Sequence, residues 1–247
     1  NVTYSYDSFG NVISRNFLGD VNVAGDEKYE NYSYVINTTN WIVDKLSWYV
    51  LSDSSGNKVR ETKYHYDGQV YGKNATKGDG TAVENWNNLG ANPITRFEYD
   101  KFGNVIRTID PLGKETDYRY GLRDTTFTFV DKITNALDHQ ADFKYDLGTG
   151  NLLWKKENGI YTFFYYDTFG RLVKEVQPFD SFELPTKSYN YSFDGTAPES
   201  IKISQRTTAN KTFDTYFYYD GLGNFIQFKK PADGNQQIVK NLFYDEL

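Results

Sequence analysis

An eight-residue motif that recurs along the 247-residue chain constrains its fold more than any other feature. The motif begins with Tyr-Asp, has a Gly three residues after the Asp, and continues into apolar residues. Four copies are complete, at residues 6–13, 99–106, 166–173 and 219–226. Three further copies begin with the same pair, at Tyr66-Asp67, Tyr145-Asp146 and Tyr244-Asp245. Seven Tyr-Asp pairs in one chain indicate a protein built from repeats.

The motif predicts a β-turn between two strands. An Asp at the first turn position accepts bonds from backbone N–H groups ahead of it. A Gly three residues later supplies the positive φ that a hairpin loop with a bulge requires. The complete copies place these residues at Tyr6, Asp7 and Gly10, at Tyr99, Asp100 and Gly103, at Tyr166, Asp167 and Gly170, and at Tyr219, Asp220 and Gly223. The aromatic residue before the Gly (Phe9, Phe102 or Phe169) is expected to fold over the hairpin end and pack there.

A second type of turn completes the repeating unit. Asp110-Pro111-Leu112-Gly113 again has Asp first, Pro second and Gly fourth. Residues 114–120 then alternate as a strand does. Each unit is therefore a strand, an Asp-x-x-Gly turn, a strand and a second turn, which predicts a repetitive ribbon of antiparallel hairpins.

Degenerate copies at Tyr34, Tyr120 and Phe193 extend the repeat along the chain. A propeller blade needs about 40 residues, and the shortest spacing here is about half of that. Residues 1–247 are therefore expected to form a single repeat array with almost no helix. Residues 68–93 are expected to be an irregular insertion because they are rich in Gly.

Two hairpins are predicted with particular detail. The turn 53–57 should join a strand from Trp41 to Leu51 to an alternating strand from Lys58 to Tyr66. Asn158-Gly159 should form a type I′ turn between residues 152–157 and 160–166, because both central positions of that turn need positive φ.

On these motifs the chain resembles the YD-repeat, or Rhs-repeat, proteins. These include bacterial Rhs elements, shell components of insecticidal toxin complexes and the YD shell of teneurins. The octets and the turn 110–113 carry the resemblance, which covers almost the whole chain. It implies an all-β ribbon that coils, like a β-solenoid, as part of a hollow shell. It also implies a non-catalytic segment of an exported shell that encapsulates or displays another part of its own polypeptide, such as a toxin.

The amino-acid composition narrows the classes of protein and of partner that remain possible. Aromatic residues make up 18% of the chain, which suits β packing. The absence of Cys excludes disulfides and thiol catalysis. A net charge of −6 disfavours nucleic acid as a partner, and no apolar run is long enough for a membrane-spanning helix. The missing Met and the repeat that begins at Tyr244 suggest a fragment of a larger shell. Six glycosylation sequons, at Asn1, Asn31, Asn37, Asn74, Asn190 and Asn210, give mild support to a secreted or cell-surface location.

Few residues of the sequence are candidates for catalysis or metal binding. His65 and His139 are the only histidines, and a metal site between them is weighed against simple polar strand positions. The repeated aspartates resemble the paired carboxylates of glycosidases, but each already has a role as a turn former. A calcium site at residues 78–80 is a further alternative, because Asp79 lies between two glycines there. The sequence therefore predicts no enzyme, no metal and no cofactor.

Four tryptophans are candidates for stacking on sugars: Trp41, Trp48, Trp86 and Trp154. The competing interpretation is that they pack between repeats as part of the wall. The expected partners are the adjoining repeats and a cargo domain of the same polypeptide. The alternative function is a cell-surface adhesion or carbohydrate-binding module that recognises a glycan or a protein receptor.

Overall fold

A computed structural model describes residues 1–20, 22–196, 198–234 and 236–244. Within these ranges it contains nineteen β-strands and no helix. The prediction of an all-β chain with almost no helix is confirmed. The chain divides into two compact units, one formed by residues 1–119 and 133–138 and the other by residues 120–132 and 139–247.

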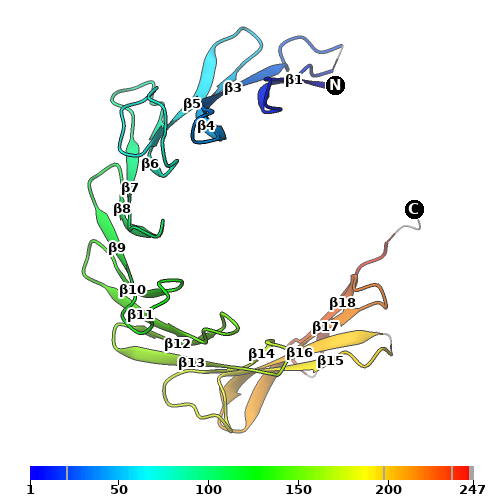
Figure 1. Cartoon of the computed structure of the whole chain (residues 1–247). Helices are drawn as coiled ribbons and strands as arrows, with labels where there is room; N and C mark the ends of the chain where they lie inside the picture. The colour runs from blue at the N-terminus through cyan, green and yellow to red at the C-terminus, as the bar shows by residue number, and fades with distance from the viewer. Residues whose placement is uncertain (21, 197, 235, 245–247) are drawn as a thin grey trace. The chain divides into compact units, whose positions relative to one another are not determined.

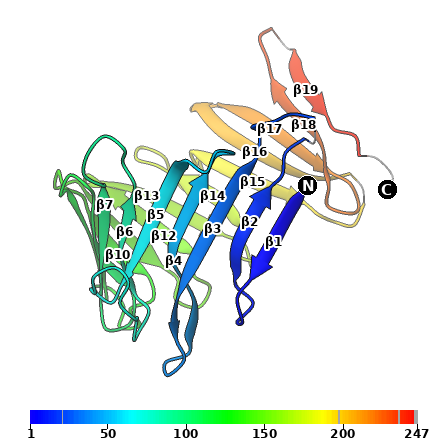
Figure 2. The same cartoon turned by 90° about the horizontal axis from the view of Figure 1, so that it is seen from above.

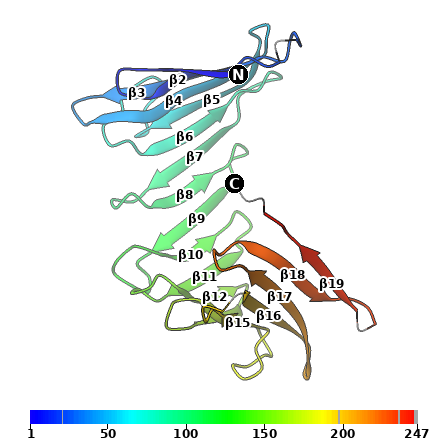
Figure 3. The same ribbon diagram turned by 90° about the vertical axis from the view of Figure 1, so that its right-hand side faces the viewer.

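The first unit is an antiparallel sheet in which each strand pairs with the next one along the chain (Figure 1). Figure 3 shows β5 to β9 side by side in chain order. Its strands are β1 (Val2–Tyr6), β2 (Val12–Phe17), β3 (Lys28–Asn37), β4 (Ile42–Ser52), β5 (Lys58–Tyr66), β6 (Gly80–Asn85), β7 (Ile94–Tyr99), β8 (Val105–Ile109) and β9 (Glu115–Tyr120). The strands β3 and β4 are the longest, with 10 and 11 residues, and lie between β2 and β5 in Figure 2.

The second unit repeats this arrangement from β11 to β19. Its strands are β11 (Gln140–Tyr145), β12 (Leu152–Glu157), β13 (Ile160–Tyr166), β14 (Leu172–Val176), β15 (Lys187–Ser192), β16 (Glu199–Thr208), β17 (Lys211–Tyr219), β18 (Phe225–Pro231) and β19 (Gln237–Asn241). The residues of β10 (Val130–Thr134) are divided between the two units.

Each complete motif produces an irregularity in strand pairing at its tyrosine. The register shifts between residue 98 and Tyr99, between residue 165 and Tyr166, and between residue 218 and Tyr219. The predicted bulge is therefore present, and the Tyr is the residue at which the incoming strand departs from regular pairing.

The predicted hairpins are confirmed. Strands β4 and β5 are joined by the turn at residues 53–57, and Gly56 has a φ of 80°. In the β12–β13 hairpin, Asn158 and Gly159 have φ values of 49° and 86°, as a type I′ turn requires.

The expected irregular insertion at residues 68–93 is only partly irregular. Residues 80–85 form β6, which pairs with both β5 and β7. The run of glycines suggested a loop, but Thr81, Ala82 and Val83 continue the sheet once the chain has returned to it. The irregular parts are the segments before and after this strand.

The buried interior is small, because a single sheet layer has little apolar side-chain volume to cover. One buried cluster in the first unit consists of Val35, Ile42 and Ala75, with Tyr66 packed against it. Ala75 belongs to the segment that precedes β6 and is fully buried. This segment therefore covers one part of the sheet.

Candidate functional site

The Asp of each motif is bonded to the turn that it begins. In the copy at Asp100, one carboxylate oxygen accepts the backbone N–H of Phe102 at 2.8 Å and that of Asn104 at 2.9 Å. The other oxygen accepts the side-chain amide of Asn104 at 3.1 Å. Gly103 closes the turn by donating its N–H to the Asp100 carbonyl at 3.2 Å, with a φ of 87°. The carboxylate is thus occupied by three donors of its own turn.

The same arrangement recurs at other turns. Asp at the first position accepts bonds from the residues two and four places ahead at Asp7, Asp53, Asp110, Asp167 and Asp220. The sequence analysis treated Asp53 only as part of a turn, because Ser52 stands where the motif has Tyr. The residue after the Gly marks it as a motif turn, since Asn57 donates its side-chain amide to Asp53 as Asn104 does to Asp100.

These contacts change the acidity of the turn aspartates. At Asp53 and Asp220 the side-chain amides of Asn57 and Asn224, followed by backbone N–H groups, lower the pKa of the carboxyl below its ordinary value. At Asp100 burial raises the pKa, but the donors of the turn outweigh it and the pKa is lowered. The carboxylates are therefore held ionised by the turns that they stabilise.

One expectation about the turns is wrong. The aromatic residues before the Gly do not fold over the hairpin end: Phe9, Phe102 and Phe169 are 41%, 56% and 82% exposed. These exposed fractions are too large for rings that are packed over the hairpin end. Instead Lys101 lies over Phe102, and Arg171 lies over Phe169, as cation–π pairs.

The tyrosine hydroxyls make a link that the sequence analysis missed. The Tyr99 hydroxyl donates to the Gly80 carbonyl at 2.8 Å, and the Tyr166 hydroxyl donates to the Leu152 carbonyl at 3.0 Å. In six such bonds the accepting carbonyl lies 14 to 22 residues earlier in the chain than the tyrosine. The tyrosines are Tyr34, Tyr66, Tyr99, Tyr166, Tyr191 and Tyr244. The regular return of Tyr at strand ends is the sequence signal that could have found it.

In the motif copies whose turns are irregular, the Asp carboxylate accepts hydrogen bonds from residues at other positions of the turn. At Asp146 the turn is one residue longer, as predicted, and the carboxylate accepts the N–H groups of Gly148 and Thr149. Tyr145 stacks on Phe129 with 4.8 Å between ring centroids. In the last copy Tyr244 is placed, whereas Asp245 lies outside the described residues.

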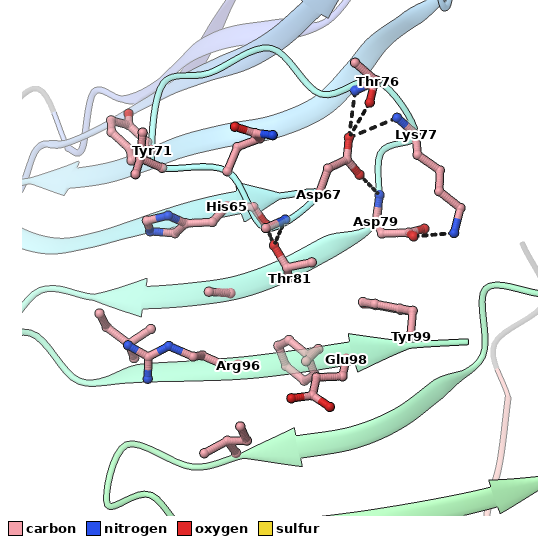
Figure 4. Close-up of a pocket in the computed structure, with 17 residues that line it drawn as sticks. His65, Asp67, Tyr71, Thr76, Lys77, Asp79, Thr81, Arg96, Glu98 and Tyr99 are labelled. Atoms are coloured by element: carbon pink, nitrogen blue, oxygen red, sulfur yellow. Dashed lines mark hydrogen bonds and ion pairs between the residues drawn. The ribbon is translucent and has the colours of Figure 1, made fainter. Parts of the chain in front are cut away.

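Asp67 holds the segment that leads to β6. Its carboxylate accepts the backbone N–H groups of four successive residues, 76 to 79, at distances between 2.7 and 3.3 Å (Figure 4). Burial raises the pKa of Asp67, but these four donors outweigh it and the pKa is lowered. The loop from residue 68 to residue 79 is thereby fixed against the end of β5.

A pocket of about 850 Å³ lies beside this loop, over β5 to β8. Figure 4 shows His65 and Tyr71 at one end and Arg96, Glu98 and Tyr99 along its wall. The His65 ring lies 3.4 Å from a Glu84 oxygen and meets the Tyr71 ring edge-on at 5.9 Å between centroids. Lys77 is paired with Asp79 at 2.6 Å. Of the charged residues that line the pocket, Lys77 and Asp79 are therefore paired with each other, and Asp67 is bonded to backbone N–H groups.

Two of the carboxylates that line the pocket are already bonded within the protein. The carboxylate of Asp67 is saturated by N–H donors, and that of Asp79 is bonded to Lys77. Arg96 stands out because it has no ion pair with any residue that the structure describes. The pocket could accommodate a small ligand with one negative charge, but only this one cation would select it.

The sequence offered two metal alternatives, a site between His65 and His139 and a calcium site at residues 78–80. In the described ranges no three His, Asp or Glu side chains are grouped so that they could hold a metal ion. The N–H groups of Gly78 and Asp79 point at Asp67. No helix in the described part of the chain is long and apolar enough to cross a membrane.

The four tryptophans do not form one site. Trp41 is 73% exposed at the turn between β3 and β4. Trp48 donates its indole N–H to Glu61 at 2.7 Å, and Lys58 lies over the ring of Trp86 at 4.6 Å. Trp154 belongs to a group of aromatic rings on β12 and β13. Among the described residues, Trp154 is the one tryptophan in contact with another aromatic ring, that of Tyr161.

The fold and the turn geometry define an all-β repeat protein. No protein-family model matches the sequence, and no curated protein matches it. Three solved structures of toxin complexes are similar to it at low TM-scores. The crystal structure of TcdB2-TccC3-TEV aligns with 97% of the chain at 11% identity and a TM-score of 0.44. The structure of TcdB2-TccC3 without its hypervariable C-terminal region aligns with 98% at 12% identity and a TM-score of 0.43.

The third is a Tc holotoxin pore from Photorhabdus luminescens, which aligns with 98% of the chain at 12% identity and a TM-score of 0.39. The chain spans only 15% to 16% of the length of these three proteins. The similarity thus extends over nearly the whole of this chain and over a small part of each of the others.

Proposed function

We propose that the chain is a non-catalytic wall segment of a YD/Rhs-type shell. In this role it forms part of an exported polypeptide and encloses or displays another segment of that same polypeptide. Its partners are the adjoining repeats and the enclosed segment. The proposal rests on the repeat motif and on how its Tyr and Asp side chains are bonded within the chain itself.

The observation that carries the proposal is the series of tyrosine hydroxyl bonds between successive repeats. Each bond joins a tyrosine to a backbone carbonyl 14 to 22 residues earlier in the chain, as Tyr66 does with Leu46 and Tyr191 does with Leu172. A protein whose repeats bury surface only against their neighbours needs such links to remain continuous. A continuous single sheet layer is suited to a wall.

The use of the motif aspartates supports a structural role over catalysis. A catalytic carboxylate must be free to contact a substrate. Those of Asp7, Asp100 and Asp220 each accept bonds from two backbone N–H groups and one side-chain amide of their own turns. The repeated acidic residues are therefore explained without a reaction.

Protease protection of the complete gene product would test the proposal. If the chain is part of an enclosing wall, a segment outside the repeats should stay intact under native digestion. It should become sensitive when the wall is weakened by a double variant, Tyr66→Phe with Tyr99→Phe. A double variant at exposed positions without a hydroxyl bond, Tyr4→Phe with Tyr6→Phe, serves as the control and should leave the segment protected. Digestion of that segment at the same rate in the wild type and in both variants would contradict enclosure.

A further inference from the structure

A surface with no role in the wall lies on one face of β11, β12 and β13. In the strand register Lys144 is opposite Trp154, which is opposite Phe163. In the next row Lys156 is opposite Tyr161. Directly opposed residues project from the same face of a sheet. Lys144, Trp154, Lys156, Tyr161 and Phe163 are therefore neighbours on one face and are called the lysine–aromatic patch.

The three rings of the patch are in contact and open to solvent. Trp154 meets Tyr161 edge-on, with 5.2 Å between the ring centroids. Tyr161 and Phe163 are stacked, with centroids 5.7 Å apart and an angle of 11° between their planes. The side chains of Tyr161 and Phe163 are 39% and 40% exposed. The patch thus presents a continuous aromatic surface.

The lysines of the patch differ from two lysines on the opposite face of the sheet, Lys155 on β12 and Lys187 on β15. Lys155 is bonded to Glu157 at 2.7 Å and Lys187 to Glu175 at 3.4 Å. Neither Lys144 nor Lys156 forms an ion pair with any described residue, and the Lys156 ammonium lies 5.0 Å from the centre of the Tyr161 ring. The two lysines of the patch therefore carry charges that no described acid neutralises.

The acid closest in register does not neutralise the patch. Asp142 is opposite Lys156 in the register, but its carboxylate is bonded to Arg123 at 3.1 Å. The Arg123 guanidinium also lies 5.1 Å from the centre of the Trp154 ring. Arg123 also lies 3.8 Å from Asp131, so this guanidinium is paired with two carboxylates. The unpaired positive charges beside the rings are those of Lys144 and Lys156, although the whole chain carries a net charge of −6.

A hollow adjoins the aromatic surface. It has a volume of about 350 Å³ and is lined by Tyr161, Phe163, Val176 and Pro178 among others. This volume lies at the lower end of the range for small-molecule sites, roughly 300–1,000 Å³. The rings therefore form both an open surface and one wall of a recess.

The positive and aromatic character continues beyond the patch. Lys202, Tyr216 and Lys229 are opposite one another in a single row across β16 to β18. Alternation along β13 to β16 places this row on the same face as the patch. Lys202 is paired with Asp214 on the same face at 2.6 Å, whereas Lys229 forms no ion pair with any described residue and its ammonium lies 4.9 Å from the centre of the Tyr218 ring. A polymer could therefore contact the face at more than one place.

We propose that the lysine–aromatic patch binds an acidic polysaccharide, a chain of sugars that bear carboxylates. The C–H groups on one side of a pyranose ring are apolar and pack on aromatic rings, while its carboxylate pairs with an ammonium group. Tyr161 and Phe163 supply the stacking surface, and Lys144 and Lys156 supply the charge. Such binding does not depend on whether the chain encloses a cargo.

Two other occupants fit the same observations less well. The cores of protein interfaces are depleted in Lys and favour Arg among the cations, whereas the free cations of this patch are lysines. Duplex DNA carries one charge per roughly 1.7 Å of its axis and is bound by dense basic surfaces. Isolated lysines on an acidic chain suit a polymer with fewer charges, such as one carboxylate per sugar.

Isothermal titration of the full chain with polygalacturonate, at low salt and neutral pH, would test the inference. The wild type should bind, Lys156→Gln should weaken binding roughly three- to tenfold, and Tyr161→Ala should weaken it by a similar factor. Lys155→Gln is the matched control, because the adjacent lysine lies on the opposite face and should not matter. Circular dichroism of each variant would confirm that it is folded.

Three results would overturn the inference. The first is equal binding of neutral dextran, because the lysines would then play no part. The second is an equal loss of affinity in Lys155→Gln and Lys156→Gln, which would indicate unspecific attraction to the protein. The third is tighter binding of a thirty-nucleotide poly(dT) that is lost in the same variants, which would make single-stranded nucleic acid the occupant.

Discussion

The hydroxyl of Tyr66 donates a hydrogen bond to the carbonyl oxygen of Leu46 at 2.8 Å. It therefore joins the end of β5 to the strand before it, over a separation of 20 residues. The ring is packed against the buried cluster of Val35, Ile42 and Ala75. Burial, with nearby Tyr64 and Asp44 adding smaller effects, raises the pKa of Tyr66 to about 12. This tyrosine combines the repeat link with part of the small apolar core.

Replacing Tyr66 by Phe should lower the free energy of unfolding by about 1 kcal/mol, because the Leu46 carbonyl loses its donor while the ring is kept. Tyr6→Phe is the matched control: Tyr6 ends β1 as Tyr66 ends β5, but it is 58% exposed and should change stability little. Urea denaturation of both variants would measure the difference. Equal midpoints would show that the hydroxyl link contributes nothing.

Replacing Gly103 by Val should destabilise the protein by roughly 1–3 kcal/mol, because a β-branched residue resists positive φ. The φ of Gly103 is 87°, and a Cβ there would meet no atom within 4 Å. The cost would therefore come from the backbone alone. Gly90→Val is the control, since Gly90 has no positive φ and lies in the irregular segment after β6. Denaturation midpoints that fall by the same amount would contradict the turn assignment.

Acid should remove stability that the turn aspartates provide. Because the pKa of Asp67 is lowered in the folded chain, its contribution is fully present above the ordinary Asp pKa of about 3.9. The contribution is lost as the pH falls from that value through the lower folded pKa. Melting temperatures between pH 7 and pH 2 should therefore fall steeply below about pH 4.

The variant Asp67→Asn would distinguish the contribution of Asp67 to the pH dependence of stability from that of the other turn aspartates. An amide oxygen still accepts N–H bonds but does not titrate, so the variant should be less stable at pH 7 and lose less stability in acid. Asp194→Asn is the control, because that carboxylate has only the N–H of Thr196 as a partner in the described structure. Parallel melting curves for Asp67→Asn and the wild type over the whole pH range would contradict the role of this carboxylate.

The sequence predicted the turns better than the contacts between repeats. Asp100 and Gly103 act over four residues, so their geometry follows from local rules. The bond from Tyr99 to Gly80 depends on how neighbouring strands are placed, which the local pattern does not contain. The exposure of Phe169 was missed for a related reason: its hydrophobicity suggested packing, but the ring does not pack over the hairpin end.

The same limit applied to the candidate sites. Asp67 could be recognised as a motif residue from the sequence. Its role as acceptor for the N–H groups of residues 76–79 could not be predicted, because the sequence does not show that the loop after Asp67 folds back to it. Trp154 could be named as a possible stacking residue. Its neighbours Tyr161 and Phe163 follow only from the register of β12 with β13.

The last prediction concerns β1, which pairs with β2 and has all five of its residues exposed. Val2, Tyr4 and Tyr6 are 43%, 51% and 58% exposed, and the two tyrosine rings are stacked at 6.5 Å. An exposed apolar strand is a template for pairing with another chain. The isolated chain should therefore self-associate as its concentration rises, which light scattering would detect.

Replacing Tyr4 and Tyr6 by Lys should reduce this association, because charged side chains discourage pairing at an exposed strand. Leu112→Lys is the control: Leu112 is 82% exposed but lies in a turn, so the added charge there should leave the association largely unchanged. A wild-type chain that remains monomeric at all concentrations, with the amides of β1 protected from hydrogen exchange, would contradict the prediction. Such a result would mean that β1 is stable without a further partner.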